Sequence, residues 1–289
     1  MKKVISEADI ADYRNLMLTL IEERDPDRKA AIALSGGTDS TTLLFAMLSS
    51  GRKPRCYTFY VEGTISEDLI ASRNLAKSFD LELIEVMIPY DHDKLVADIR
   101  QLVPAIVGPK LKKTIVQCLH PWLYLVPAMK ERGDTTVLCG LGGDDHFCTQ
   151  RKVAVFLHKN GEEALLKEGW RKCYSLDVNF SGGNIHHFCA ARGVTLSDIY
   201  NDDRMTAWFT QFTSEALHRT GSGKWRTKAA SVRAFIDFYS KGAFFREPDR
   251  YQLGSNLKGY HESLMTTAFN KNGSKDVLPI YKAIINNEV

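Results

Sequence analysis

Strand and helix patterns alternate along the chain from Lys29 to Cys148, and this alternation restricts the fold more than any other feature of the sequence. Short aliphatic and β-branched runs, typical of buried strands, are separated by stretches whose apolar residues recur every three or four positions, typical of amphipathic helices. Such alternation predicts a parallel sheet with helices on both faces, joined by right-handed crossovers. The expected fold class is therefore α/β, with a doubly wound parallel sheet.

Individual elements can be assigned from the same patterns. Helices are expected at residues 7–23, 39–50, 66–80 and 121–133, and strands at 30–34, 55–61, 81–89 and 135–139. Ser66 is a suitable N-cap for the third helix, and Gly51 is placed to end the second. The segment 91–118 is expected to be helical in parts, with breaks at Pro104 and Pro109, because proline cannot donate a helical hydrogen bond.

The chain divides into two expected parts. A length of 289 residues exceeds what one small core needs. After Cys148 the strand signals fade and the pattern becomes mainly helical with long loops. We therefore expect a sheet-bearing part at 1–150. The part at 151–289 is expected to be mainly helical and to complete the acceptor site, either packed on the sheet or standing alone.

Composition and cysteine spacing indicate a cytoplasmic protein. The sequence has no run of about 18 apolar residues that could span a membrane, and its N-terminus lacks the apolar core of a signal peptide. The six cysteines are scattered and form no C-x-x-C pair, which argues against a zinc ribbon and a disulfide framework. We expect reduced, mostly buried thiols.

The stretch SGGTDS at residues 35–40 stands between an expected strand and an expected helix. Its glycines let backbone N–H groups point at one spot next to a helix N-terminus, which favours a bound anion. Hydroxyl groups are added by Ser35, Thr38, Ser40 and Thr41. Asp39 would repel a phosphate unless Mg²⁺ lay between them, because Mg²⁺ takes carboxylate and phosphate oxygens together. The loop therefore suits a magnesium-bound phosphate or pyrophosphate.

Competing interpretations of this loop fit less well. A Walker A loop needs a lysine, and a dinucleotide fingerprint needs a third spaced glycine; the loop has neither. An ordinary serine-capped turn is the remaining structural interpretation.

A second glycine-rich turn, GLGGDD at residues 140–145, also follows an expected strand. The carboxyl ends of parallel strands share one edge of a sheet, where ligands bind. Asp39 and Asp144 could then share metal ions that bridge a triphosphate. Taken alone, Asp144 and Asp145 could equally be a helix N-cap.

The SGGTDS stretch resembles the S-G-G-x-D-S pyrophosphate loop of the N-type ATP pyrophosphatases (the PP-loop superfamily), which cleave ATP to AMP and pyrophosphate while adenylating a substrate. Within that superfamily the chain is most similar to the synthetase domain of asparagine synthetases and β-lactam synthetases. Three further segments carry this resemblance: TFYVEGTISEDLIASRNLAKSFDLELIEV from Thr58, VLCGLGGDDHF from Val137 and NDDRMTAWF from Asn201.

The resemblance implies ATP and Mg²⁺ as cofactors and assigns roles to individual residues. It implies that the β- and γ-phosphates bind Ser35, Gly36, Gly37, Thr38 and Ser40, and that Mg²⁺ binds Asp39 and Asp144. It also implies that Leu34 and Val61 flank the adenine, with Gly140 contributing backbone. Leu34 and Val61 could equally be core residues.

Two parts of the family's catalytic machinery are not assigned to single residues by this resemblance. Where the family has a glutamate that assists attack on the acyl-adenylate, this chain has Leu141. Other acids that could serve as the base are Asp145, Asp202, Asp203 and Glu215. The family also uses a lysine to stabilise charge at the phosphate. The candidates for this role are Lys224, Lys275 and Lys258.

The resemblance implies an ATP-dependent, AMP-forming ligase or amidating enzyme that adenylates a carboxylate. The chain enters the synthetase helix within a few residues of Met1. We therefore expect the nitrogen to come from free ammonia, from a separate glutaminase subunit or from another amine.

One alternative is an RNA- or nucleobase-modifying PP-loop enzyme, which the basic run His218–Arg233 would suit. Nucleic acid is not favoured, because ATP would satisfy those charges and the net charge is only +3. A second alternative is a catalytically reduced ATP-binding partner subunit, which Leu141 would suit.

Overall fold

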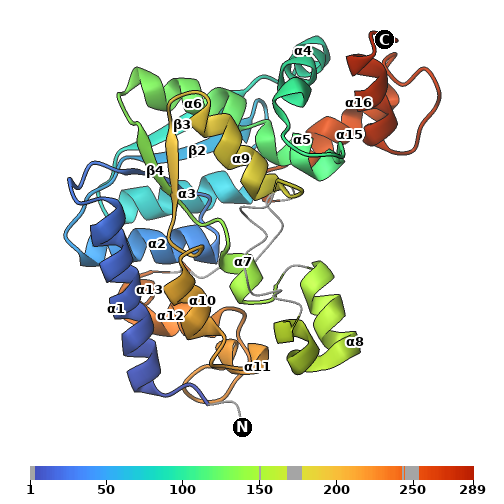
Figure 1. Ribbon diagram of the computed structural model, residues 1–289. Helices are drawn as coiled ribbons and strands as arrows, with labels where there is room; N and C mark the ends of the chain where they lie inside the picture. Colours follow the sequence, from blue (N-terminus) through green and yellow to red (C-terminus); the bar gives the residue numbers. More distant parts are fainter. Residues whose placement is uncertain (1–3, 150, 168–177, 243, 245–253) are drawn as a thin grey trace.

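The fold is built on one parallel sheet (Figure 1). The computed structural model describes residues 4–149, 151–167, 178–242, 244 and 254–289. The strands are β1 (Ala31–Ala33), β2 (Cys56–Val61), β3 (Leu83–Ile88), β4 (Thr136–Cys139) and β5 (Thr195–Asp198). They lie in the order β3-β2-β1-β4-β5, and every neighbouring pair is parallel. The predicted α/β class with a parallel sheet is confirmed.

Helices cover both faces of the sheet, as Figure 1 shows. On the lower face in that view lie α1 (Glu7–Arg24), α2 (Thr38–Ser49), α3 (Glu67–Ser78), α10 (Asp203–Phe209), α12 (Ala229–Ala234) and α13 (Ile236–Tyr239). The other face carries α4 (His92–Leu102), η1 (Val103–Ala105), α5 (Lys113–Leu119), α6 (Trp122–Glu131), α9 (Ser181–Ala190), α15 (Leu257–Glu262), η3 (Ser263–Thr266) and α16 (Val277–Ile285). The remaining helices are α7 (Gly143–His146), α8 (Arg151–Lys167) and α11 (Ser214–Leu217).

Two hydrophobic cores follow from the alternation of side chains along each strand. In β4, Leu138 packs into the core beneath the sheet, whereas Val137 and Cys139 pack into the core above it. Successive residues of a strand point to opposite faces, so a sheet buried on both sides needs apolar residues at nearly every position. This requirement explains the continuous apolar runs seen in the sequence.

Several predicted boundaries are confirmed. The Ser66 hydroxyl accepts a hydrogen bond from the Leu69 amide (3.1 Å) and caps α3. Gly51 adopts φ +77° directly after the C-cap of α2, a conformation that glycine tolerates better than other residues. Pro104 lies in the short η1 turn that follows α4.

The fifth strand was not expected from the sequence. The expectation of a mainly helical pattern after Cys148 is wrong for Thr195–Asp198, which pairs with β4 from Thr136↔Thr195 to Cys139↔Asp198. This strand is only four residues long, TLSD, and carries one aliphatic side chain, so its β signal is weak. The C-terminal region therefore extends the sheet. A boundary between 1–150 and 151–289 remains a prediction.

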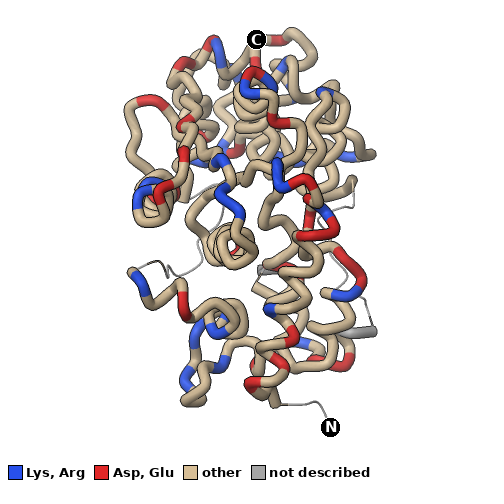
Figure 2. The backbone as a smooth tube through the Cα atoms, turned by 90° about the vertical axis from the view of Figure 1, so that its left-hand side faces the viewer, with Lys and Arg blue, Asp and Glu red and all other residues tan. Residues whose placement is uncertain are grey.

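The distribution of charged residues, the apolar character of the helices and the state of the cysteines agree with the composition. Acidic and basic residues are interspersed over the backbone (Figure 2). Among the described helices, none has the length and apolar character to cross a bilayer. The described cysteines are Cys56, Cys118, Cys139, Cys148 and Cys189, and all are buried and unpaired with one another. Cys173 lies outside the described residues.

Candidate active site

The loop between β1 and α2 presents the start of a helix at the carboxyl edge of the sheet. Gly37 is the N-cap of α2, and no side chain caps the helix, so amide groups of its first turn are left for a ligand. The Ser35 hydroxyl accepts from the Gly37 amide (3.3 Å), and the Ser40 hydroxyl donates to the Gly37 carbonyl (3.1 Å). These bonds hold the loop in a shape that favours an anion.

The two glycine-rich turns are in direct contact. A methyl group on Gly140 would lie 2.9 Å from the Ser40 amide nitrogen, and one on Gly143 would lie 2.4 Å from Cγ of Asp39. Only glycine allows such an approach, because a Cβ atom would overlap its neighbour. The expectation that both turns share one edge of the sheet is confirmed.

The carboxylates of the two turns converge on one ammonium group. Nζ of Lys228 lies 2.6 Å from Oδ2 of Asp39 and 2.5 Å from Oδ1 of Asp144. The Lys228 side chain is 3% exposed, that of Asp39 14% and that of Asp144 53%. Both carboxylates are therefore close enough to share a cation, as expected from their places after neighbouring strands.

Lys228 is held in place through its backbone. It is the N-cap of α12 and adopts φ +54°, a left-handed conformation that few non-glycine residues take. Its amide donates to Nδ1 of His218 (2.8 Å), so Nε2 of that ring carries the proton and donates to the Phe147 carbonyl (2.9 Å). The segment that bears the lysine is thus fastened to the residue just after the acidic turn.

Lys228 was not predicted from the sequence, although it lies in the basic run His218–Arg233. The lysines predicted for this role are Lys224, Lys275 and Lys258. Lys224 and Lys275 are exposed, and Lys258 pairs with Glu262 (3.6 Å). Lys224 lies within the loop that the isolated bridge between Arg219 and Trp225 closes. The structure places Lys228, and none of these three lysines, on the two carboxylates; which lysine acts in catalysis remains a prediction.

The charges of this group depend on one another. Burial raises the pKa of Asp39 to about 6; Lys228 reduces that shift and Asp144 adds to it. Burial also acts to raise the pKa of Asp144, but Lys228 and the Thr149 hydroxyl bring it below its usual value. For Lys228, burial disfavours the charged form, yet the two carboxylates raise its pKa above the ordinary value. The ammonium is therefore charged at neutral pH.

The site fits a magnesium-bound triphosphate. Three buried oxygens beside the loop have no hydrogen-bond partner within the described structure, namely Thr38 Oγ1, Asp39 Oδ1 and Thr41 Oγ1. Buried polar atoms left without a partner cost free energy, so a ligand that satisfies them binds favourably. Mg²⁺ in nucleotide sites takes one or two carboxylates and completes its shell with phosphate oxygens and water. Asp39 and Asp144 suit that role.

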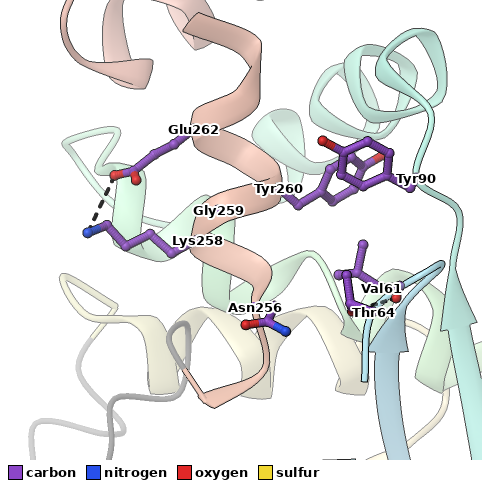
Figure 3. A pocket seen from close by; sticks show the side chains of 8 residues that line it. All are labelled: Val61, Thr64, Tyr90, Asn256, Lys258, Gly259, Tyr260 and Glu262. Atoms are coloured by element: carbon purple, nitrogen blue, oxygen red, sulfur yellow. Dashed lines mark hydrogen bonds and ion pairs between the residues drawn. The ribbon is translucent and has the colours of Figure 1, made fainter. Parts of the chain in front are cut away.

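A cavity of about 400 Å³ opens at the carboxyl ends of β2 and β3 (Figure 3). It is lined by Val61, Thr64, Tyr90, Asn256, Lys258, Gly259, Tyr260 and Glu262. Of the two predicted adenine neighbours, Val61 lies in the wall of this cavity, although it is fully buried. Leu34 is 2% exposed in the lower core. Contact of either residue with adenine remains a prediction.

The acids proposed as bases lie in different settings. Asp145 is fully buried in α7. Asp202 caps α10 and pairs with Arg24 and Arg204; the hydrogen bond from Arg204 is the main reason that its pKa falls to about 2. Leu141 packs against the upper core.

The remaining two acids are in exposed positions. Asp203 is exposed, and Glu215 pairs with Arg219. A role of any of these acids as the base remains a prediction.

A parallel sheet whose phosphate-binding loop and second acidic turn meet at its carboxyl edge defines a protein of the N-type ATP pyrophosphatase class. Comparison with protein families agrees: residues 23–234 match the asparagine synthase family. Because the match covers well over half of the chain, the protein belongs to this family.

Other comparisons add little. No curated protein sequence matches the chain. Among solved structures, U34-tRNA thiolase NcsA from Methanococcus maripaludis with its [4Fe-4S] cluster is similar to this chain at 11% identity. The match covers 94% of this chain and 76% of that chain, with a TM-score of 0.36. The assignment depends on the family match and the site.

Proposed function

We propose that this protein is an ATP-dependent, AMP-forming carbon–nitrogen ligase. It adenylates a carboxylate, releases pyrophosphate and passes the acyl group to ammonia or an amine. The observation that carries the proposal is the convergence of Asp39 and Asp144 on Lys228. Adenylation needs negative phosphate groups to be held and neutralised at one place, and these residues combine metal-binding carboxylates with a buried cation.

Each part of the site has a role in this proposal. The uncapped start of α2 and the hydroxyls of its loop hold the phosphates that leave as pyrophosphate. Asp39 and Asp144 hold Mg²⁺, which supplies charge neutralisation to the triphosphate when bound. Lys228 stabilises the negative charge that develops at the phosphorus under attack; removal of such a contact typically slows a reaction by about 100- to 1,000-fold.

The substrates are small molecules in this proposal. The carboxylate and the nitrogen donor meet beside the acidic turn. The nitrogen comes as ammonia, as an amine or through a separate glutaminase subunit.

RNA thiolation is less well supported by the described residues. All five described cysteines are buried. Burial raises the pKa of the Cys56 and Cys189 thiols to about 12, so they are poor sources of thiolate. Within the basic run, Arg219 pairs with Glu215 and Arg233 pairs with Glu7. These charges are already partly compensated.

The proposal is tested with ATP labelled at the α- and γ-phosphates. The protein is incubated with MgCl₂, ammonium chloride and, one at a time, the common amino acids and short dicarboxylic acids. We expect AMP and pyrophosphate to form with a matching acid. ADP and inorganic phosphate would contradict the proposal, and tight ATP binding without turnover of any acid would favour a binding subunit.

Variants connect this activity to the site. Asp39→Asn and Asp144→Asn should each lower AMP formation by about 100-fold or more, because each removes a carboxylate from the metal. Asp80→Asn is the matched control, since its side chain is 97% exposed and pairs with the exposed Lys53. It should keep wild-type turnover.

A further inference from the structure

A second polar cluster lies at the carboxyl ends of β4 and β5. Its centre is the carboxylate of Asp198, whose side chain is 3% exposed. Oδ1 of Asp198 accepts from Sγ of Cys139 (2.6 Å), and Oδ2 accepts from Nδ2 of Asn201 (2.6 Å) and from Nε2 of His186. A buried carboxylate with three donors is held firmly and can orient each of them.

His186 is a partly exposed member of this cluster. Its side chain, on α9, is 21% exposed. Because Nε2 faces the Asp198 carboxylate, it carries the ring proton, and Nδ1 keeps the basic lone pair. In the part of the chain that the structure describes, Nδ1 has no hydrogen-bond partner. A histidine whose tautomer is set by a buried aspartate is the usual arrangement of a general base.

The cluster adjoins the nucleotide site through successive close contacts. Asp198 is in register with Cys139, the residue directly before the glycine-rich turn. Asn201 packs on that turn so closely that a methyl group on Gly142 would lie 2.9 Å from its Oδ1. The next residue, Gly143, packs on Asp39. The cluster therefore lies on the β4–β5 side of the phosphate loop, opposite the cavity beside Val61.

Position 141 of the same turn is leucine, so the turn supplies no acid there. Asp39 and Asp144 are bound to Lys228, and Asp145 is fully buried. We infer that His186, oriented by Asp198, is the base that accepts the proton of the attacking amine. This inference depends on the proposed function and deepens it.

The step is a simple acyl transfer. The nitrogen lone pair of ammonia or an amine forms a bond to the acyl carbon of the acyl-adenylate. The bond from that carbon to the AMP oxygen breaks, and AMP leaves with the electron pair. The surplus proton on nitrogen passes to Nδ1 of His186. Asp198 acts as a positioning residue, and base catalysis of this kind typically contributes about 100- to 10,000-fold in rate.

The test separates adenylation from transfer in His186→Gln, with the carboxylate identified by AMP release. Exchange of labelled pyrophosphate into ATP, which reports adenylation, should stay within about threefold of wild type. Amide formation with ammonium chloride should fall by about 100-fold or more. The pH–rate profile of transfer should lose its acidic limb. Thermal unfolding checks that the variant is folded.

Two further variants strengthen the test. His187→Gln is the matched control, because His187 is the next residue on α9 and is exposed; it should behave as wild type. Asp198→Asn should slow transfer and shift the acidic limb, because it changes the partner that sets the tautomer of His186. Equal transfer by wild type and His186→Gln, with exchange present in both, would overturn this inference alone. Absence of exchange in the wild type with every acid would overturn the proposed function as well.

Discussion

At the scale of single residues, the site is a balance of two negative charges and one positive charge. Lys228 binds the same carboxylates that are proposed to bind Mg²⁺. A divalent cation must therefore compete with the ammonium for these oxygens. Because the side chain of Lys228 is only 3% exposed, water contributes little to screening that competition.

This competition predicts the behaviour of Lys228→Met. The variant should bind Mn²⁺ in the absence of nucleotide about tenfold more tightly or better, because the repelling ammonium is gone. AMP formation should fall by about 100-fold or more. The variant should also be less stable, since it leaves buried negative charge uncompensated, and Mn²⁺ should restore part of that stability by binding the folded state.

Electron paramagnetic resonance of free Mn²⁺ and thermal unfolding with and without the metal provide the measurements. Lys224→Met is the control, because Lys224 is exposed in the same basic run. If Lys228→Met bound Mn²⁺ no better than wild type, the ammonium would not occupy the metal position.

Prediction of single residues succeeds where a residue lies at the helix start that comes after a strand. Asp39 and Asp144 could be placed from the sequence because strand ends share an edge of the sheet. Lys228 could not, since it reaches Asp144 from 84 residues away and Asp39 from 189. Its position also depends on a left-handed backbone that its sequence does not signal.

At the scale of elements, the site depends on how closely the turn that begins α7 packs on the start of α2. The approach of Gly143 to Asp39 leaves no room for a side chain. The close fit fixes the Asp39 carboxylate in space, and a fixed carboxylate loses less entropy when it binds a metal.

Gly143→Ala tests that packing. The added methyl should push Asp39 aside, weaken magnesium-dependent ATP binding by about tenfold or more and lower the free energy of unfolding by about 1–3 kcal/mol. Isothermal titration with a non-hydrolysable ATP analogue and urea unfolding measure the two effects. Gly221→Ala is the matched control, because its new Cβ would meet nothing nearer than 3.7 Å. ATP affinity equal to wild type in Gly143→Ala would show that the contact is dispensable.

Prediction of elements worked for strongly patterned segments and failed for a weakly patterned one. The strands and helices between Lys29 and Cys148 carry apolar runs or amphipathic periods that only one kind of element satisfies. Strand β5 carries a single aliphatic residue in four, and its partner β4 determines its conformation. The His186–Asp198 pair depends on that strand and was therefore not visible in the sequence.

At the scale of the whole molecule, a buried hydrogen-bond chain fastens the C-terminal helices to the upper face of the sheet. Asp98 on α4 accepts from Nε2 of His120 (3.0 Å), and Nδ1 of His120 pairs with Nε2 of His261 on α15 (3.0 Å). The Tyr281 hydroxyl on α16 donates to Nδ1 of His261 (2.6 Å). Both histidines are fully buried, and every hydrogen bond of this chain can form when both rings are neutral.

The same chain of hydrogen bonds predicts how the free energy of unfolding depends on pH. Burial is the main cause that lowers the pKa of His120, although Asp98 opposes it, and burial with the nearby His120 lowers the pKa of His261 well below the ordinary value. Below about pH 6.5 the unfolded state binds protons that the folded rings do not accept, so stability is complete above that pH and is lost as the pH falls. Both rings should therefore contribute to a loss of stability between pH 8 and pH 5.5, and His261, whose pKa is lowered further, should contribute more than His120.

Asp39 acts in the opposite direction, because its pKa is raised to about 6 and its carboxyl gains protons in the folded state as the pH falls. Comparison of His261→Gln with wild type cancels that contribution. The variant should be less stable at pH 8, yet it should lose less of its stability than wild type on going to pH 5.5. Urea unfolding at both pH values measures the difference, and His187→Gln, on an exposed ring, should keep the wild-type dependence. If His261→Gln lost as much stability as wild type between the two pH values, His261 would accept a proton in the folded protein. The attachment of the C-terminal helices could then not require an uncharged His261.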